Sequence, residues 1–162
     1  MQNISSNFKK YYLKQIDKLF WFKKPKIILT KKNDNNYNWF PDGKINVYYN
    51  CITSNLNKNT HKTAIITINQ KNKINKYSFK KIDELVNLLG LYLKKISKKK
   101  NLKIMIHSSA SLESTIMMLV CAKLGYHFSV IFEELESVGI ENRIKIFKPD
   151  IFFTRTKKKI FY

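Results

Sequence analysis

The sequence has little of what marks several common classes of protein. Cysteine occurs only twice in 162 residues, at Cys51 and Cys121, which does not indicate a secreted, disulfide-rich scaffold. No apolar run approaches the roughly 18 to 20 residues of a membrane-spanning helix. Residues 1–10 also lack the apolar stretch of a secretory signal. We therefore predict a cytoplasmic protein that has no membrane segment.

Arginine is scarce as well. Of the 31 basic residues only Arg143 and Arg155 are arginine, although the formal net charge is +20. Proteins that recognise phosphates and bases favour arginine, because its planar guanidinium donates two hydrogen bonds at once. The lysines occur together with many Asn, Ile, Phe and Tyr residues, which are encoded by codons rich in A and T. We therefore attribute the charge to drift in an AT-rich genome, and expect nonspecific, salt-sensitive attraction to polyanions but no specific nucleic-acid partner.

Residues that would bind phosphates or metals are few and scattered. The four glycines are isolated from one another: Gly43, Gly90, Gly125 and Gly139. The sequence therefore has no glycine-rich loop to cradle phosphates. The histidines are His61, His107 and His127. Their spacing to cysteines and acidic residues is not that of a metal site. Cys121 lies in an apolar pattern typical of a small core residue. We predict no catalytic residue and no metal ligand in this chain.

What is present indicates a globular fold, since 44% of the residues are hydrophobic and 14% are aromatic. Residues 8–22 have apolar positions at nearly helical spacing, and Pro25 closes that segment. Residues 31–38 are polar and rich in asparagine, which is typical of a loop. The amino-terminal part is therefore predicted to be a helix followed by irregular chain.

Two aromatic residues and a proline-led turn follow in residues 39–43. We expect Gly43 to take a positive φ in that turn. Residues 45–52 are compatible with an extended or short helical piece. We expect this piece to pack Val47, Tyr49 and Cys51.

From residue 62 the apolar pattern becomes regular. Residues 63–69 form a β-branched run, and residues 76–79 are expected to pair back against it as a second strand. Ser78 is a candidate N-cap for a helix that runs to about Ile96. One apolar stripe defines its packed face: Phe79, Ile82, Val86, Leu89, Leu93 and Ile96.

The remaining pattern alternates strand and helix. Strands are expected at 102–106, 126–132 and 150–154, and helices at 112–124 and 136–147. Ser111 should begin the first of these helices, and Gly125 should end it. Such an order predicts an α/β fold with parallel β-α-β units and right-handed crossovers. The helix at 112–124 is apolar nearly all round, so we expect it to leave an exposed patch on the isolated chain, which looks unfinished.

Six segments in register over residues 14–154 resemble one family, the acetyl- and propionyl-CoA synthetases of the adenylate-forming superfamily. The segment 39–51 is similar to that family's W-F-x-x-G-x-x-N-x-x-x-N-C/A sequence, and 113–125 to its E-A-V-x-A-M-L-A-C-A-R-I-G helix. The other four segments are 21–25, 77–82, 129–132 and 143–149. In the last of these, residues 143–144 and 148–149 match the family.

The resemblance implies the fold and reaction of an adenylate-forming ligase. Residues 1–60 would be the amino-terminal extension of acetyl-CoA synthetases, and residues 61–162 the truncated first part of the AMP-binding domain. The family joins acetate or propionate to CoA through an acyl-adenylate, and it uses ATP, Mg²⁺ and CoA. Its phosphate-binding loop and acid pocket lie past the last residue of this chain. The resemblance therefore implies an amino-terminal fragment that is inactive alone and that has no site for ATP or Mg²⁺.

One residue of the chain matches a family contact to CoA. In the family an aromatic residue, two glycines and a second aromatic residue lie along the CoA nucleotide, and Phe132 matches the first of them. Glu133 and Glu134 replace the two glycines, and carboxylates there would repel phosphates. Phe132 is therefore either a contact to CoA or a residue of the sheet core.

Two alternatives to an inactive fragment remain. The chain could be one subunit of a split synthetase, whose partner is a separately encoded remainder of the enzyme. It could instead be a basic module that binds RNA or another polyanion.

Overall fold

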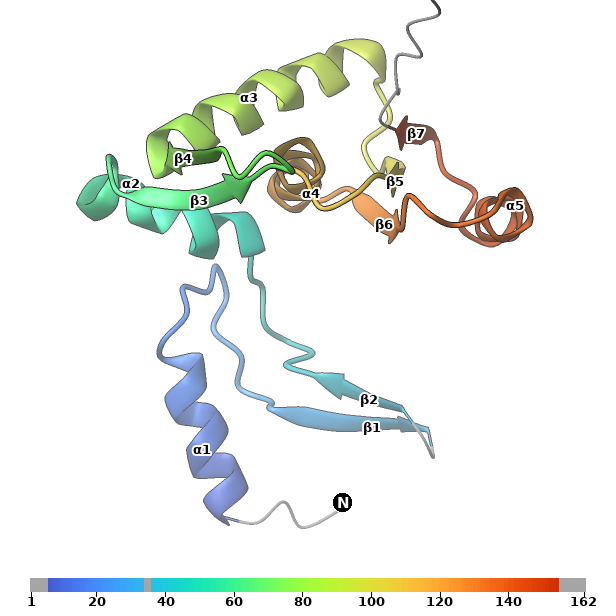
Figure 1. Ribbon diagram of the computed structural model, residues 1–162. Coiled ribbons are helices and arrows are strands. Elements are labelled where there is room, and N and C mark those ends of the chain that lie inside the picture. The colour runs from blue at the N-terminus through green and yellow to red at the C-terminus, as the bar shows by residue number, and fades with distance from the viewer. Residues whose placement is uncertain (1–5, 34–35, 155–162) are drawn as a thin grey trace, which may run out of the picture. The chain divides into compact units, whose positions relative to one another are not determined.

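The computed structural model describes residues 6–33 and 36–154. The chain divides into two compact units, residues 1–51 and 52–162 (Figure 1). The two units are separated by where the chain packs compactly, which does not test where one functional domain ends and the next begins. The boundary at residue 60, between an amino-terminal extension and the AMP-binding part, stays a prediction.

The first unit begins with helix α1 (Ser6–Ile16), which is shorter than the helix predicted for residues 8–22. The indole Nε1 of Trp21 donates a hydrogen bond to the carbonyl oxygen of Ile16, at 3.0 Å. A helix leaves its last carbonyl groups without partners in the helix. Trp21 supplies one such partner from outside the helix, which is why α1 can end there.

Strands β1 (Leu29–Asn33) and β2 (Asn36–Trp39) form an antiparallel hairpin in this unit. The loop predicted for residues 31–38 is therefore wrong. Every residue of β2 is exposed, so its polar composition suits a strand that faces water on both sides. Trp39 nevertheless packs, with its ring centroid 4.8 Å from that of Tyr12 on α1.

Residues 45–52 turn into helix, and a π-helical segment, η1 (Tyr49–Thr53), leads into α2 (Ser54–Asn59). The buried residues are Tyr48 and Ile52, whereas Val47 and Cys51 are exposed. The predicted packing of Val47 and Cys51 is therefore wrong. The reason is periodicity: alternation applies to a strand, whereas positions 48 and 52 share one face of a helix.

In the second unit, α2 is followed by the antiparallel strands β3 (Thr63–Ile68) and β4 (Ile74–Ser78), as predicted. Helix α3 (Phe79–Ile96) follows at once. The hydroxyl of Ser78 accepts a hydrogen bond from the backbone N–H of Lys81, which confirms the predicted N-cap. The helix buries Ile82, Val86 and Leu93, but Ile96 is exposed.

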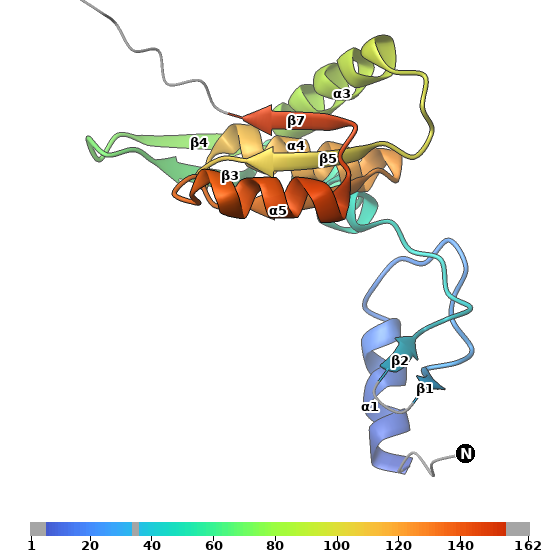
Figure 2. The ribbon, with the colours of Figure 1, turned by 90° about the vertical axis from the view of Figure 1, so that its right-hand side faces the viewer.

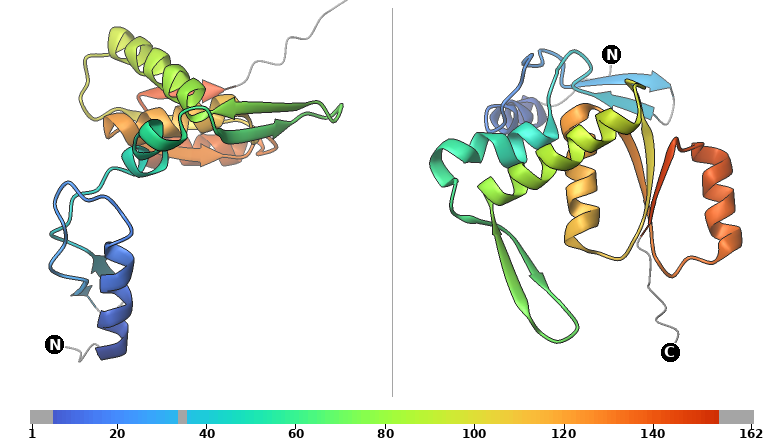
Figure 3. Two further views of the ribbon diagram at one scale, coloured as in Figure 1. Left: turned by 90° about the vertical axis from the view of Figure 1, so that its left-hand side faces the viewer. Right: turned by 90° about the horizontal axis from the view of Figure 1, so that it is seen from above.

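Three parallel strands form a second, separate sheet in this unit: β5 (Lys103–His107), β6 (His127–Ile131) and β7 (Ile151–Thr154). Their spatial order is β6-β5-β7. Helices α4 (Leu112–Leu124) and α5 (Ser137–Phe147) connect them and lie on opposite sides of the sheet (Figure 3). The predicted α/β fold with parallel β-α-β units is confirmed.

Helix α4 begins and ends as predicted. Ser111 and Ser114 exchange side-chain and backbone hydrogen bonds at its start, and Gly125 ends it at φ 71°. In this helix, which the structure describes throughout, only Glu113 is exposed, because α3 packs on one side and the sheet on the other. The exposed patch predicted on this helix is therefore wrong.

Exposed apolar side chains lie on other elements of this unit. They include Leu88, Leu91 and Tyr92 on α3, Val138 and Ile146 on α5, and Phe132 after β6. None of the helices in the described part of the chain is long and apolar enough to cross a membrane.

Candidate functional site

The carboxyl ends of the three parallel strands form the first candidate site. In open α/β sheets, ligands bind in the crevice outside these ends, where successive helices go to opposite faces of the sheet. Here α4 and α5 take opposite faces, and the three strands are parallel with β5 in the middle. Figure 2 shows β5 and β7 running in the same direction. The residues at this edge are His107, Phe132 and Thr154.

Phe132 follows the last residue of β6 and is 80% exposed. The interpretation as a sheet-core residue is wrong, because the strand ends at Ile131, which is itself 3% exposed. A tight turn then re-directs the chain, since the backbone N–H of Leu135 donates to the carbonyl of Phe132 at 3.2 Å. The ring of Phe132 is thus presented to solvent at the strand end.

The residues beside Phe132 fit only part of a CoA nucleotide. An exposed aromatic ring can stack on an adenine base. Glu133 and Glu134 follow in the same turn, half-buried and exposed respectively. Each carboxylate would oppose a nearby phosphate by about 1 kcal/mol in water. The exposed ring at this edge is thus compatible with stacking on a base, whereas the two carboxylates oppose phosphates.

The same edge also has a contact between Thr154 and His107 that the sequence did not predict. The hydroxyl oxygen of Thr154 lies 3.3 Å from Nδ1 of His107. The other ring nitrogen, Nε2, is buried and has no hydrogen-bond partner among the described residues. The two residues are brought together by the parallel pairing of β5 with β7. No local sequence signal reveals this pair, since 47 positions separate its members.

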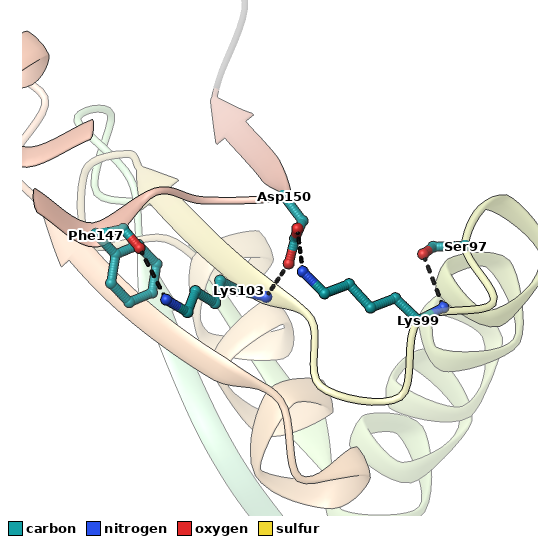
Figure 4. Close-up of polar contacts among 5 residues, drawn as sticks. All are labelled: Ser97, Lys99, Lys103, Phe147 and Asp150. Atoms are coloured by element: carbon teal, nitrogen blue, oxygen red, sulfur yellow. Dashed lines mark hydrogen bonds and ion pairs between the residues drawn. The ribbon is translucent and has the colours of Figure 1, made fainter. Parts of the chain in front are cut away.

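The opposite, amino-terminal edge of the sheet is held by Asp150 (Figure 4). Its carboxylate accepts hydrogen bonds from Nζ of Lys99, at 2.6 Å, and from the backbone N–H of Lys103, at 2.8 Å. The bond from Lys99, followed by that from Lys103, keeps the pKa of this carboxyl below its ordinary value. Asp150 therefore fixes the starts of β5 and β7 relative to each other.

The remaining reactive side chains do not converge. Within residues 6–33 and 36–154, no three His, Cys, Asp or Glu side chains lie close enough together to hold a metal ion. His61 and His127 are exposed. Cys121 is fully buried, and burial raises the pKa of its thiol to about 12. The prediction that Cys121 is a core residue is confirmed.

The two segments that resemble the family in the first unit, 21–25 and 39–51, are hydrogen-bonded to each other through the backbones of Lys23 and Lys44. Residues next to segment 21–25 also bond to segment 39–51. The backbone N–H groups of Lys26 and Ile27 donate to the carboxylate of Asp42, at 2.9 and 3.1 Å. The amide of Asn50 bonds both the N–H and the carbonyl of Phe20. These residues hold the backbone together, so their role in this unit is structural.

Gly43 belongs to the same motif, and its expected positive φ is wrong. A Cβ at this position would lie 2.8 Å from the indole of Trp21 and 3.1 Å from Pro25. Glycine is required here by close approach of the Trp21 ring, and not by backbone conformation. Asn46 accepts a bond from the N–H of Tyr49, which starts the helical turn that follows.

Known proteins resemble both units. A family model described as the acetyl-coenzyme A synthetase N-terminus matches residues 1–51. The acetyl-coenzyme A synthetase of Helicobacter pylori strain P12 is 34% identical over 128 residues, which are 78% of this chain and 19% of that protein. The enzyme of Ralstonia pickettii strain 12J is 32% identical over 127 residues, with the same two coverages.

A solved structure shares the fold. Acetoacetyl-CoA synthetase from Streptomyces lividans superposes with a TM-score of 0.77 at 14% identity, covering 91% of this chain and 22% of that one. The described residues thus have the α/β fold of the amino-terminal region of an acyl-CoA synthetase. The chain is similar to the amino-terminal part of acetyl-coenzyme A synthetases. It spans about a fifth of the length of the curated relatives.

Proposed function

We propose that the chain acts as the amino-terminal part of a short-chain acyl-CoA synthetase of the cytoplasm. The reaction converts acetate or propionate, ATP and CoA to acyl-CoA, AMP and pyrophosphate through an acyl-adenylate. The observation that supports this most is the 34% identity over 128 residues to acetyl-coenzyme A synthetases.

The proposal includes inactivity of these 162 residues alone. Holding ATP requires backbone N–H groups that converge on phosphates, usually from a glycine-rich loop. The four glycines of this chain are isolated, and the matched part of the relatives is 19% of their length. Activity then requires the remainder of a synthetase. If that remainder is a separate polypeptide, as in a split enzyme, it is the partner of this chain.

The test compares the purified chain alone with the chain mixed with a second polypeptide. That polypeptide covers the part of the Helicobacter pylori enzyme that the chain does not match. We expect AMP formation that depends on acetate or propionate only in the mixture, together with co-elution of the two polypeptides. The second polypeptide alone is the control. Turnover of ATP and acid by the 162-residue chain alone would refute the proposal.

Within this function, Phe132 is the residue of the chain that contacts CoA. In the reconstituted enzyme, Phe132→Ala should raise the KM for CoA, because the exposed ring is lost from the strand end. The double substitution of Glu133 and Glu134 by glycine should lower that KM, because two carboxylates are removed. Val138→Ala, at another exposed apolar position, is the control. If neither change at 132–134 alters the KM for CoA, Phe132 is not a contact.

A further inference from the structure

A concavity of about 580 Å³ lies at the amino-terminal edge of the sheet. Its walls come from the last turn of α3, the loop between α3 and β5, and the end of α4 with the residues just before β6. Phe132 and Thr154 lie at the opposite ends of the strands. The concavity is therefore distinct from the edge at which the family resemblance places CoA.

The side chains that line this concavity are strongly basic. No acidic residue is among them. The lining lysines are Lys94, Lys98, Lys99, Lys100 and Lys123, and the other lining residues are Ser97, Leu124 and Tyr126. A recess lined by charges of one sign concentrates ions of the opposite sign. The expected occupant is therefore an anion.

Two of the five lysines already have carboxylate partners. Nζ of Lys99 lies 2.6 Å from a carboxylate oxygen of Asp150, and Nζ of Lys123 lies 3.5 Å from one of Asp83. Among the residues that the structure describes, Lys94, Lys98 and Lys100 have no carboxylate within ion-pair distance. Three positive charges around the recess are thus left uncompensated.

Stabilisation of helix ends accounts for only part of this charge. A cation in the last turn of a helix interacts favourably with the partial negative charge there. Lys94 and Lys123 occupy such positions in α3 and α4. Lys98 and Lys100 lie beyond the end of α3 at Ile96, where the helix gains little from them.

We propose that this concavity binds a small anion that carries two or more adjacent phosphate groups. Lysine binds phosphate as a point charge and does not need the planar geometry of arginine. Three ammonium groups without a carboxylate partner in one lining match several phosphate groups better than a single phosphate. The hydroxyl groups of Ser97 and Tyr126 are further hydrogen-bond donors in the lining. Inorganic tripolyphosphate is the probe.

The experiment titrates tripolyphosphate into the full chain by calorimetry, at about 150 mM salt, where long-range attraction is screened. The site variant replaces Lys94, Lys98 and Lys100 by glutamine. The control variant replaces Lys71, Lys73 and Lys76 by glutamine; these are exposed residues of the β3–β4 hairpin. The control variant and the site variant therefore have the same net charge. We expect the site variant to lose at least about tenfold in affinity and the control less than about twofold.

A second measurement guards against misfolding of the site variant. Lys98 and Lys100 lie outside the helices, so Lys98→Gln with Lys100→Gln should leave the circular dichroism spectrum unchanged while weakening binding. Tripolyphosphate should also raise the Tm of the unsubstituted chain more than that of this double variant. Equal losses in the site and control variants would show that net charge alone attracts the probe, and would overturn the proposal. Absence of binding to the unsubstituted chain, or binding of RNA without binding of tripolyphosphate, would overturn it too.

Discussion

Gly43 and Gly90 show how the surroundings of a glycine, and not its φ, can decide whether it is replaceable. Neither takes a positive φ. A Cβ on Gly43 would lie 2.8 Å from the ring of Trp21, whereas a Cβ on Gly90 would meet Leu124 at 3.6 Å, an ordinary contact distance. The first position has no room for a methyl group and the second has.

Alanine substitution should therefore have opposite effects at these two positions. Gly43→Ala should destabilise the first unit by about 1 to 3 kcal/mol, since the indole must move. Gly90→Ala should stabilise α3 by about 0.5 to 1 kcal/mol, since alanine is the better helix former. Both tryptophans lie in the first unit, so denaturant unfolding followed by tryptophan fluorescence reports on Gly43→Ala, and circular dichroism on Gly90→Ala. A stable Gly43→Ala variant would contradict the packing of Trp21.

Asp150 predicts how stability depends on pH. Its pKa lies below the ordinary value of 3.8, because Lys99 and the N–H of Lys103 bond its ionised form. A lowered folded-state pKa contributes stability that is present above the unfolded value and is lost as pH falls through the folded value. Asp150→Asn should therefore lower the urea midpoint at pH 7, and the difference from the unsubstituted chain should shrink towards zero near pH 2.

Glu141→Gln is the matched control for Asp150→Asn. Glu141 pairs with Lys145 at 3.9 Å, and both side chains are exposed. Such pairs contribute little, so this variant should unfold with nearly the same midpoint at both pH values. A midpoint for Asp150→Asn that follows the unsubstituted chain at pH 7 would show that the Lys99 contact has no energetic role.

At the scale of elements, the start of α4 illustrates a local signal that works. Ser111 accepts a bond from the N–H of Ser114, and the hydroxyl of Ser114 accepts one from the N–H of Ser111. Two N–H groups that a helix start would leave unpaired are thus satisfied.

Ser111→Ala should cost about 1 kcal/mol of unfolding free energy, because the cap is lost. Ser137→Ala is a suitable control, since Ser137 lies exposed in the first turn of α5, whose N-cap Glu136 makes no side-chain cap bond. Chemical denaturation followed by circular dichroism compares the two variants. Equal stabilities would show that the capping box contributes nothing.

The sequence predicted the elements whose ends are marked by nearby residues, and it missed the hairpin that forms through pairing of two strands. Helices α3 and α4 were predicted within a residue, because Ser78, Ser111 and Gly125 mark their ends locally. The β1–β2 hairpin was missed, because its residues are polar and exposed, and pairing between strands leaves no mark in such a composition.

At the scale of the whole molecule, burial differs from what hydrophobicity alone predicts. The apolar helix α4 is covered, whereas α3 leaves Leu88 and Leu91 68% and 66% exposed. The predicted association hazard therefore moves from α4 to the outer surface of α3.

Replacing Leu88 and Leu91 together by glutamine should reduce the binding of a hydrophobic dye and the tendency to associate, with little change in Tm. Leu93→Ala is the contrasting variant, since Leu93 is 2% exposed, and should cost about 2 to 5 kcal/mol. Dye fluorescence, light scattering and thermal unfolding measure these effects. Unchanged dye binding in the double variant would place the accessible apolar surface elsewhere.

The sequence by itself determined the order of strands and helices from β3 to β7, the α/β class and the resemblance to one family. These follow from apolar periodicity, caps and short motifs, all of which act between residues close in sequence. Only the tertiary structure decided that Phe132 is exposed, that Thr154 lies beside His107, and that lysines from α3, its following loop and α4 line one recess. Such placements depend on which strands pair and which helix faces are covered, and long-range packing settles both.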